Sequence, residues 1–192
     1  MSARVNPTWV DPTSVYGIPR ENLSPGSLVG AGSVILFPEL VVMRGVGRID
    51  SQSYISVGLE MGDRTVVCPG AKVIGGAGRK VVMGEFSYIG WNSLVMARSE
   101  DYSHLVGVGF GAPGPAIEGD VIFEPFSGVS SLCSVHPGVR FPEGAVVGLH
   151  SMVYRSEDLR PWWIHIGVPA RPWKPRADRD TILREAEEAR RA

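Results

Sequence analysis

Apolar residues begin a new unit about every six positions along most of the chain, and a small residue stands four positions after nearly every one. The units start at Leu23, Val29, Ile35, Val41, Ile49, Ile55, Met61, Val67, Val73, Met83, Ile89, Val95, Ile117, Phe123, Val129, Val135, Phe141 and Val147. About two units out of roughly eighteen depart from the pattern, with Glu39 and Leu59 at the small position. Neither the two-residue period of a sandwich strand nor the helical period of about 3.6 residues gives such a repeat.

This repeat predicts an all-β fold, a parallel β-helix of short strands and tight turns. The first residue of each unit points inward and stacks on its equivalents in neighbouring coils. The small residue fits a narrow corner, and glycine allows the backbone conformations that the turns need. Cys133 occupies a small position, so we interpret it as a core residue rather than a reactive thiol.

The repeat is interrupted at three places. About two extra residues follow the Val41 unit, about four follow Val73 and about sixteen follow Val95. The second interruption contains GGAGRK (75–80), and the third is a loop over 101–116. A loop of this length in a compact repeat is more often functional than accidental.

Composition narrows the function classes. The chain has 192 residues and a formal net charge of -1, which gives no electrostatic reason to bind nucleic acid or an anionic membrane. It contains no stretch of roughly 20 apolar residues, so we expect no membrane insertion. The first ten residues lack the apolar core of a signal peptide, and cysteine is scarce, so we expect a cytoplasmic protein. The charged C-terminal segment predicts a short helix.

Two segments carry a more specific signal. Residues 137–153, PGVRFPEGAVVGLHSMV, resemble the terminal coils of the hexapeptide-repeat acyltransferases, commonly PGV-x-IG-x-xAVVGAGS-x-V. Residues 166–176, IGVPARPWKPR, resemble the strand that follows those coils, commonly AGxPAKxIKxR. With the repeat, the resemblance covers about residues 10–175. It implies a left-handed parallel β-helix of about six triangular coils and a homotrimer.

The resemblance also organises the chain. We expect a lead-in segment over 1–22, a β-helix domain over 23–175 and a C-terminal helix over 176–192. Because three units make one coil in this family, the interruptions after Val73 and Val95 leave from the same edge, one coil apart. The same corner one coil further on lies between Ser134 and Val135, immediately before His136. Arg79, Lys80, the long loop and His136 should therefore share one edge.

Acyl transfer from a thioester needs a base for the acceptor and donors for the developing oxyanion. Sugar O-acetyltransferases of this family often have a loop histidine after a Ser-Asp pair, and some relatives read SDDYSG. The segment SEDYSH (99–104) resembles both, which makes His104 the first candidate base. Asp101 could orient that imidazole, act as the more important acid, or simply form a turn. His136 could bind the acceptor or be the base itself.

Further residues are assigned to the two substrates. The candidates for the acceptor are His136, Trp91, Arg79 and Tyr102. Trp91 should point outward, where its indole could stack on a sugar or pack against a neighbouring subunit. The positions that match the family's coenzyme A contacts are Ser131, Leu149, Tyr154, Arg171 and Lys174. Arg171 and Lys174 are cations suited to the phosphates of the coenzyme. His150, His165, Trp162 and Trp163 are interpreted as structural.

The resulting hypothesis is an acyltransferase that moves an acetyl group from acetyl-CoA to a hydroxyl or amino group of a sugar or nucleotide sugar. No metal is required. A γ-class carbonic anhydrase is unlike this chain, because the histidines show no closely spaced pair. The alternative is a non-catalytic β-helix scaffold. The bulky pair Leu149 and His150 favours it, since the family usually has Ala-Gly there and bulk could narrow the coenzyme groove.

Overall fold

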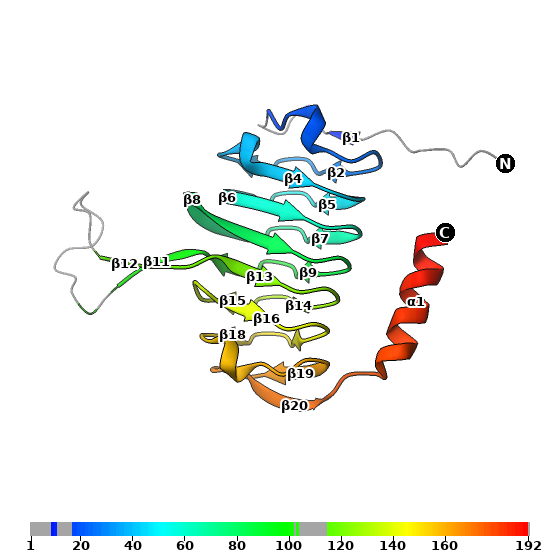
Figure 1. The fold of residues 1–192 in the computed structure, drawn as a ribbon. Helices are drawn as coiled ribbons and strands as arrows, with labels where there is room; N and C mark the ends of the chain where they lie inside the picture. Colours follow the sequence, from blue (N-terminus) through cyan, green and yellow to red (C-terminus); the bar gives the residue numbers. More distant parts are fainter. Residues whose placement is uncertain (1–8, 11–16, 102, 104–114, 192) are drawn as a thin grey trace.

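The structure, a computed structural model, describes residues 9–10, 17–101, 103 and 115–191. The described chain winds into a parallel β-solenoid of about six turns with one α-helix beside it (Figure 1). Each turn has three sides, and strands of successive turns pair in parallel register. The all-β solenoid expected from the six-residue repeat is therefore confirmed.

The sides of the turns form three stacked faces. The first face contains β1 (Trp9–Val10), β2 (Leu28–Val29), β5 (Gly47–Ile49), β7 (Thr65–Val67), β9 (Tyr88–Ile89), β14 (Gly128–Val129), β17 (Val146–Val147) and β19 (Trp163–Ile166). The second contains β3 (Val34–Ile35), the first halves of β6 (Tyr54–Met61) and β8 (Lys72–Met83), β10 (Leu94–Met96), β15 (Ser134–Val135) and β18 (Met152–Val153). The third contains β4 (Val41–Met43), the second halves of β6 and β8, β13 (Val121–Phe123) and β16 (Arg140–Phe141).

The remaining elements lie outside these faces. An antiparallel hairpin of β11 (Arg98–Glu100) and β12 (Ala116–Glu118) projects from the solenoid, and β20 (Arg171–Pro175) pairs antiparallel with β19. The short 3₁₀ helices are η1 (Arg20–Asn22), η2 (Pro38–Leu40) and η3 (Ser156–Asp158), and the α-helix is α1 (Arg179–Arg191). We call the hairpin formed by residues 98–101 and 115–118 the arm. Figure 1 shows the arm and α1 at opposite sides of the solenoid.

We name the corners by what they carry. The apolar corner joins the first and second faces (30–33, 50–53, 68–71, 90–93, 130–133 and 148–151). The insertion corner joins the second and third faces (36–40, 56–58, 74–80, 97–120, 136–138 and 154–158), and the arm leaves from it. The helix corner joins the third and first faces (24–27, 44–46, 62–64, 84–87, 124–127, 142–144 and 160–162).

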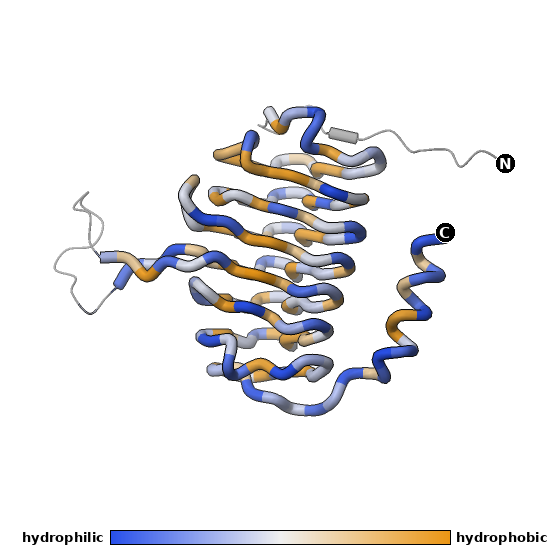
Figure 2. Tube along the Cα trace, viewed as in Figure 1, coloured by the Kyte–Doolittle hydropathy of each residue, from blue (hydrophilic) through white to orange (hydrophobic). Residues whose placement is uncertain are grey.

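The core fills the inside of the solenoid with the apolar residues that start the repeating units. Ile49, Ile55 and Val73, for example, are fully buried. In the hydropathy colouring of Figure 2, apolar stretches run along the strands and hydrophilic stretches gather at the turns. Phe123 and Phe141 stack in the third face with ring centroids 4.4 Å apart. Each buried aliphatic side chain contributes roughly 1.5–3 kcal/mol through removal of its surface from water.

The turns at two corners explain why a small residue stands four positions after each inward residue. Ser87 and Ser127 at the helix corner are buried, and each hydroxyl donates to the carbonyl three residues earlier, at 2.7 and 2.6 Å. At the apolar corner, Ser93 Oγ donates to Ser130 O and accepts from the backbone N–H of Cys133. Cys133 is buried, as expected of a core residue. A larger side chain at these positions would collide with the neighbouring coil.

The insertion corner follows a different rule, which explains the two misfits in the repeat. Glu39 lies there, exposed in η2, and Leu59 begins the third face directly after this corner, as a fully buried inward residue beside Val41 and Val81. The third face thus carries two inward residues per strand, as with Leu59 and Met61. The two extra residues of the first coil also lie at this corner, around η2, rather than after the Val41 unit.

One predicted inward position is wrong. Ile117 lies in the outward hairpin strand β12, and its side chain is 43 % exposed. The coil resumes instead at β13, where Phe123 stacks in register on Met83. The repeat count is therefore one unit too long after the arm. This error moves the expected corner from its true place at 136–138 to the bond between Ser134 and Val135, which lie together in β15.

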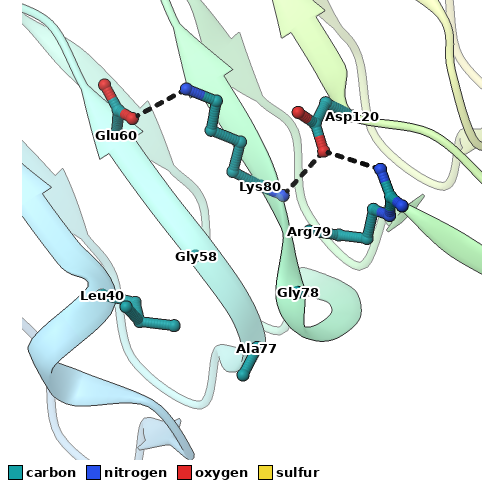
Figure 3. Close-up of a pocket in the computed structure, with 8 residues that line it drawn as sticks. All are labelled: Leu40, Gly58, Glu60, Ala77, Gly78, Arg79, Lys80 and Asp120. Atoms are coloured by element: carbon teal, nitrogen blue, oxygen red, sulfur yellow. Dashed lines mark hydrogen bonds and ion pairs between the residues drawn. The ribbon is translucent and has the colours of Figure 1, made fainter.

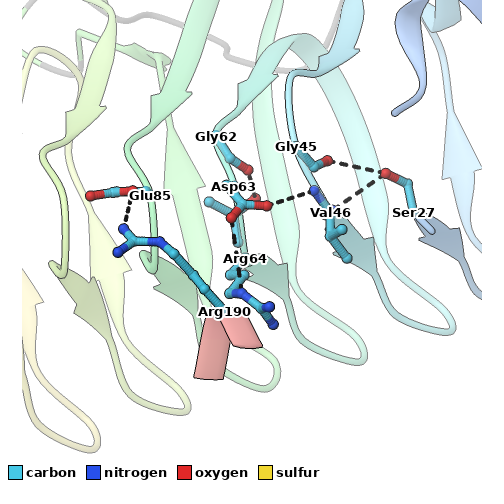
Figure 4. A network of polar contacts seen from close by, with 10 residues as sticks. Ser27, Gly45, Val46, Gly62, Asp63, Arg64, Glu85 and Arg190 are labelled. Atoms are coloured by element: carbon cyan, nitrogen blue, oxygen red, sulfur yellow. Dashed lines mark hydrogen bonds and ion pairs between the residues drawn. The ribbon is translucent and has the colours of Figure 1, made fainter. Parts of the chain in front are cut away.

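Helix α1 packs against the helix corner. Ile182 and Ala186 of α1 form a small apolar cluster with Phe126, and Phe86, Leu183 and Trp162 border it. Polar contacts flank this cluster (Figure 4): Arg190 pairs with Glu85 at 2.6 Å, and Asp63 accepts the backbone N–H of Val46. Of the two helical ion pairs that the spacing suggests, Glu187–Arg191 forms at 3.9 Å, while Arg184 donates to Thr181.

Candidate functional site

The arm is fastened to the insertion corner by charged pairs. Arg79 Nε lies 3.1 Å from Glu118 Oε2, and Arg98 lies 3.4 Å from the same carboxylate. Asp120 Oδ1 accepts the backbone N–H of Lys80 at 3.1 Å. Arg79, expected to contact the acceptor, therefore also holds the root of the arm.

Asp101 lies at the point where the arm leaves β11. Its backbone N–H donates to Pro115 O at 2.9 Å, and its Oδ1 accepts the backbone N–H and the hydroxyl of Ser103, at 3.0 and 2.6 Å. This is a side-chain-to-backbone turn of the kind that Asp favours. His104 and Tyr102, the neighbouring candidates, lie outside the described residues.

His136 lies at the foot of the arm, at the end of β15. Its ring contacts the ring of Tyr154 from the next coil, with centroids 4.7 Å apart and an angle of 44°. Two residues later, the Gly138 N–H donates to Gly119 O at the root of the arm. This packing needs glycine, because a Cβ on Gly119 would lie 2.6 Å from the Gly138 Cα.

Partial burial affects the protonation state of His136. Desolvation lowers the pKa of its imidazole below the ordinary value, so the neutral form predominates at neutral pH. A neutral imidazole can accept a proton, which is the first requirement of a general base. Tyr154, assigned from the sequence to the coenzyme, lies beside His136, and its role toward the coenzyme stays a prediction.

A second group of candidate residues lies at the apolar corner. Trp91 is 58 % exposed, as expected, and Leu149 is exposed to the same extent. Backbone hydrogen bonds stack their turns, since Leu132 N donates to Trp91 O and His150 N donates to Ser131 O. Trp91 therefore lies with the proposed coenzyme residues Ser131 and Leu149, and β10 separates it from the arm and His136. Leu132, also exposed, extends this surface and is a residue that the motif comparison missed.

The two C-terminal cations have partners within the chain. Arg171 forms an ion pair with Asp158, which lowers the pKa of that carboxyl group. The Lys174 ammonium lies 4.4 Å from the centre of the Trp173 ring. Both side chains are on β20 or its flank, exposed at the end of the solenoid, where they stay predictions as phosphate ligands.

The prediction that these residues share one edge of the solenoid is confirmed, and the structure adds their order along it. Arg79, Lys80, the arm and His136 all lie at the insertion corner, but the arm leaves between them. His136 is on the side of the C-terminal coils. On the other side is a cavity of about 340 Å³, lined in part by Glu60, Lys80 and Asp120 (Figure 3). Sequence reasoning missed the two carboxylates, because their partners lie one or two coils away in the chain.

The buried histidine, His165, has a structural role as expected. Its Nε2 accepts the backbone N–H of Arg160 at 2.9 Å, and Nδ1 lies 3.3 Å from Val146 O. Among the described residues no group of His, Cys, Asp and Glu is arranged to hold a metal ion. In the same part of the chain, no helix is long and apolar enough to cross a membrane.

A hexapeptide solenoid whose insertion corner carries an arm and polar side chains is consistent with a hexapeptide-repeat acyltransferase, as the sequence motifs indicate. Comparison with solved structures supports this class. The chain is similar to AntD, an N-acyltransferase from Bacillus cereus. A single-residue variant of AntD, in complex with dTDP-4-amino-4,6-dideoxyglucose and coenzyme A, has a TM-score of 0.77 and 26 % sequence identity, covering 87 % of this chain and 89 % of AntD.

Two further structures share the fold. AntD in complex with dTDP and 3-hydroxybutyryl-CoA matches with a TM-score of 0.70 and 23 % identity over 95 % of this chain and 87 % of AntD. A putative acetyltransferase from Bacillus cereus matches with a TM-score of 0.56 and 11 % identity over 95 % and 86 % of the two chains. No protein-family model and no curated protein sequence matches the chain. The neighbours support an enzyme of the acyltransferase class.

Proposed function

We propose that this protein transfers an acyl group from an acyl-CoA thioester to the amino group of a nucleotide sugar. The observation that carries the proposal is the similarity to AntD, which was captured with both coenzyme A and a dTDP-amino sugar and aligns along almost its whole length. This similarity favours nitrogen over oxygen as the acceptor atom, a choice that the sequence left open.

The apolar corner is the proposed donor site. Trp91, Leu132 and Leu149 offer an exposed apolar surface to the pantetheine arm, and Ser131 offers polar groups beside it. Arg171 and Lys174 are the proposed partners of the coenzyme phosphates. We propose acetyl-CoA as the natural donor, with no metal involved.

The insertion corner is the proposed acceptor site and holds the base. The base removes a proton from the sugar ammonium or from the attacking nitrogen, the nitrogen adds to the thioester carbonyl, and coenzyme A leaves as the thiolate. Three groups are candidate bases: His104, Asp101 and His136. The described geometry supports His136, whose imidazole is held neutral beside the arm. The remaining proposed acceptor contacts are Trp91, Arg79 and Tyr102. Trp91 lies at the proposed donor site as well.

The positions of these two corners support a homotrimer. In one chain β10 separates the donor residues at the apolar corner from His136 and the arm at the insertion corner. A site that contains both therefore needs the insertion corner of one subunit against the apolar corner of the next. We propose a cytoplasmic trimer with such intersubunit sites. Light scattering should give three times the mass of the chain, and a monomer would contradict an intersubunit site.

A thiol-release assay tests the reaction itself. The purified protein is mixed with acetyl-CoA and dTDP-4-amino-4,6-dideoxyglucose, free thiol is followed in time, and the product mass is measured. We expect thiol release together with an N-acetylated nucleotide sugar. dTDP-6-deoxyglucose, which differs only by a hydroxyl in place of the amine, is the matched control. Faster release with this control would assign oxygen as the acceptor atom and overturn N-acyl transfer.

A further inference from the structure

The cavity beside the arm is built by the insertions at the insertion corner. Leu40 enters it from η2, the extra residues of the first coil. The insertion in β8 supplies the opposite wall, because Val57 pairs with Gly76 while the next residue, Gly58, pairs with Lys80. Residues 77–79 therefore bulge out of the strand and curve around the hollow, as Figure 3 shows.

The floor of the cavity depends on Gly58. A Cβ at this position would lie 3.1 Å from Arg79 O, 3.5 Å from the Lys80 Cβ and 3.7 Å from the Leu40 Cβ. The absence of a side chain thus leaves space between the two walls. At about 340 Å³, the hollow is at the small end of the volumes typical of sites for small molecules.

The charges that line the cavity alternate in sign. Lys80 Nζ donates to Glu60 Oε1 at 3.1 Å, and Arg79 Nη1 lies 3.9 Å from Asp120 Oδ1. Glu60 also pairs with Arg44 at 3.6 Å, and Arg79 with Glu118 at 3.1 Å. An ammonium has three donors, a guanidinium five and a carboxylate about four acceptor positions, so hydrogen-bonding capacity remains on these groups. Lys80, Arg79, Glu60 and Asp120 are all partly exposed toward solvent.

This arrangement selects the kind of ligand. Two cations and two carboxylates give the lining no net charge, so a phosphate would be opposed by Glu60 and Asp120, and an ammonium by Lys80 and Arg79. A hydroxyl both donates and accepts, so vicinal hydroxyls match neighbouring cationic donors and carboxylate acceptors. Leu40 and Ala77 provide apolar surface for the C–H face of a ring.

We propose that this cavity binds the neutral, hydroxyl-bearing ring of a sugar. The inference rests on the proposed function to the extent that the ring belongs to the nucleotide-sugar acceptor. The same chemistry would also recognise a separate saccharide. The two sources are distinguished by experiment, because only the first makes the cavity contribute to nucleotide-sugar affinity.

The first experiment uses free sugars. Saturation-transfer NMR is recorded with the methyl pyranosides of glucose, galactose, mannose and N-acetylglucosamine on the full-length protein. At least one glycoside should bind, and both Lys80→Met and Asp120→Asn should weaken it about tenfold, because each removes a charged hydrogen-bond partner. Lys72→Met, at the exposed start of β8 outside the cavity, should leave binding unchanged.

The two cavity variants also report the charge of the ligand. If an anion were the true ligand, inorganic pyrophosphate would bind and Asp120→Asn would strengthen it. If the true ligand were a cation, Lys80→Met would strengthen its binding. Either result overturns the proposal. The proposal is also overturned if no glycoside binds and dTDP-glucose binds no more tightly than dTDP. Circular dichroism of each variant establishes that it is folded.

A second experiment identifies the source of the ring. The affinities of dTDP-glucose and dTDP are compared in the wild type, Lys80→Met and Lys72→Met. If the ring is part of the acceptor, dTDP-glucose binds more tightly than dTDP except in Lys80→Met. If a separate saccharide is bound, the ratio of the dTDP-glucose affinity to the dTDP affinity is the same in all three proteins. Lys80→Met still weakens the binding of the free glycoside in that case. Coenzyme A binding is measured independently, so loss of the acyltransferase function is distinguished from failure at the cavity.

Discussion

The imidazole of His136 packs against the phenol ring of Tyr154, with ring centroids 4.7 Å apart. The contact follows directly from the solenoid, because Val135 pairs with Val153 and each aromatic ring is on the next residue. Both side chains therefore leave the second face at the insertion corner, one coil apart. The contact shields one side of the imidazole from water, next to the root of the arm.

The first prediction concerns the base. His136→Gln should lower kcat by about 10²–10⁴-fold, the usual contribution of a general base, with little change in coenzyme A affinity. The measurement is thiol release from acetyl-CoA with the amino-sugar acceptor. Glu188→Gln is the control, because Glu188 is exposed on α1, at the opposite side of the solenoid from the arm (Figure 1). Full activity of His136→Gln would transfer the role to His104 or Asp101, which His104→Ala and Asp101→Asn then separate.

The second prediction concerns pH. Burial lowers the pKa of His136, and only the neutral imidazole accepts a proton. kcat/KM should therefore stay level down to the ordinary histidine pKa of about 6.5 and fall below it, as the pH passes through the lowered pKa. Tyr154→Ala should admit water and move this fall to higher pH. Tyr154→Phe keeps the ring and should leave the profile in place; an unchanged profile in Tyr154→Ala would refute the shielding.

The third prediction compares apolar and ionic contributions to the attachment of α1. Ile182→Ala should lower the free energy of unfolding by about 2 kcal/mol, because it removes buried surface beside Phe126. Arg190→Gln should cost about 1 kcal/mol or less, since its pair with Glu85 is exposed to water. Urea unfolding followed by circular dichroism measures both. A larger loss from Arg190→Gln would mean that the ion pair, not the apolar cluster, holds the helix.

The fourth prediction concerns His165. Burial lowers its pKa in the folded state, so below about pH 6.5 the unfolded chain binds more protons than the folded protein. Stability should therefore fall as the pH decreases through this range. His165→Gln keeps an acceptor for the Arg160 N–H but does not titrate, so its unfolding midpoint in urea should depend less on pH. Equal pH dependence in the wild type and in His165→Gln would contradict this account.

Much of the fold could be predicted from the sequence because the repeat reports burial directly. Inward residues such as Ile55 and small residues such as Ser93 are set by contacts that recur in every coil. The count of repeating units failed at Ile117, because this aliphatic residue of an outward hairpin lies six positions before Phe123, as a core residue would. Leu59 looked like a defect in the repeat and is a second inward residue of the third face, while Glu39 lies in the exposed extra turn at η2.

The site was predictable only in part. The sequence placed Arg79, the arm and His136 at one edge, because corners follow from counting. It could not show that Trp91 stands at another corner beside Ser131 and Leu149, or that Tyr154 contacts His136, since both depend on which coils are neighbours. Glu60 and Asp120 carry no motif at all. Only the pairing of β6 with β8, and the contact of Asp120 with Lys80, bring them to one cavity.

The central claim, that this solenoid uses an acyl-CoA donor, is tested most directly by calorimetry of the purified protein with acetyl-CoA and with coenzyme A. We predict saturable binding of both, with one site per chain, weakened by Leu149→Glu at the apolar corner and unchanged by Val46→Glu, at an exposed apolar residue of the helix corner. Absence of binding to either ligand would contradict the enzyme and favour a non-catalytic scaffold, in which Leu149 and His150 close the groove.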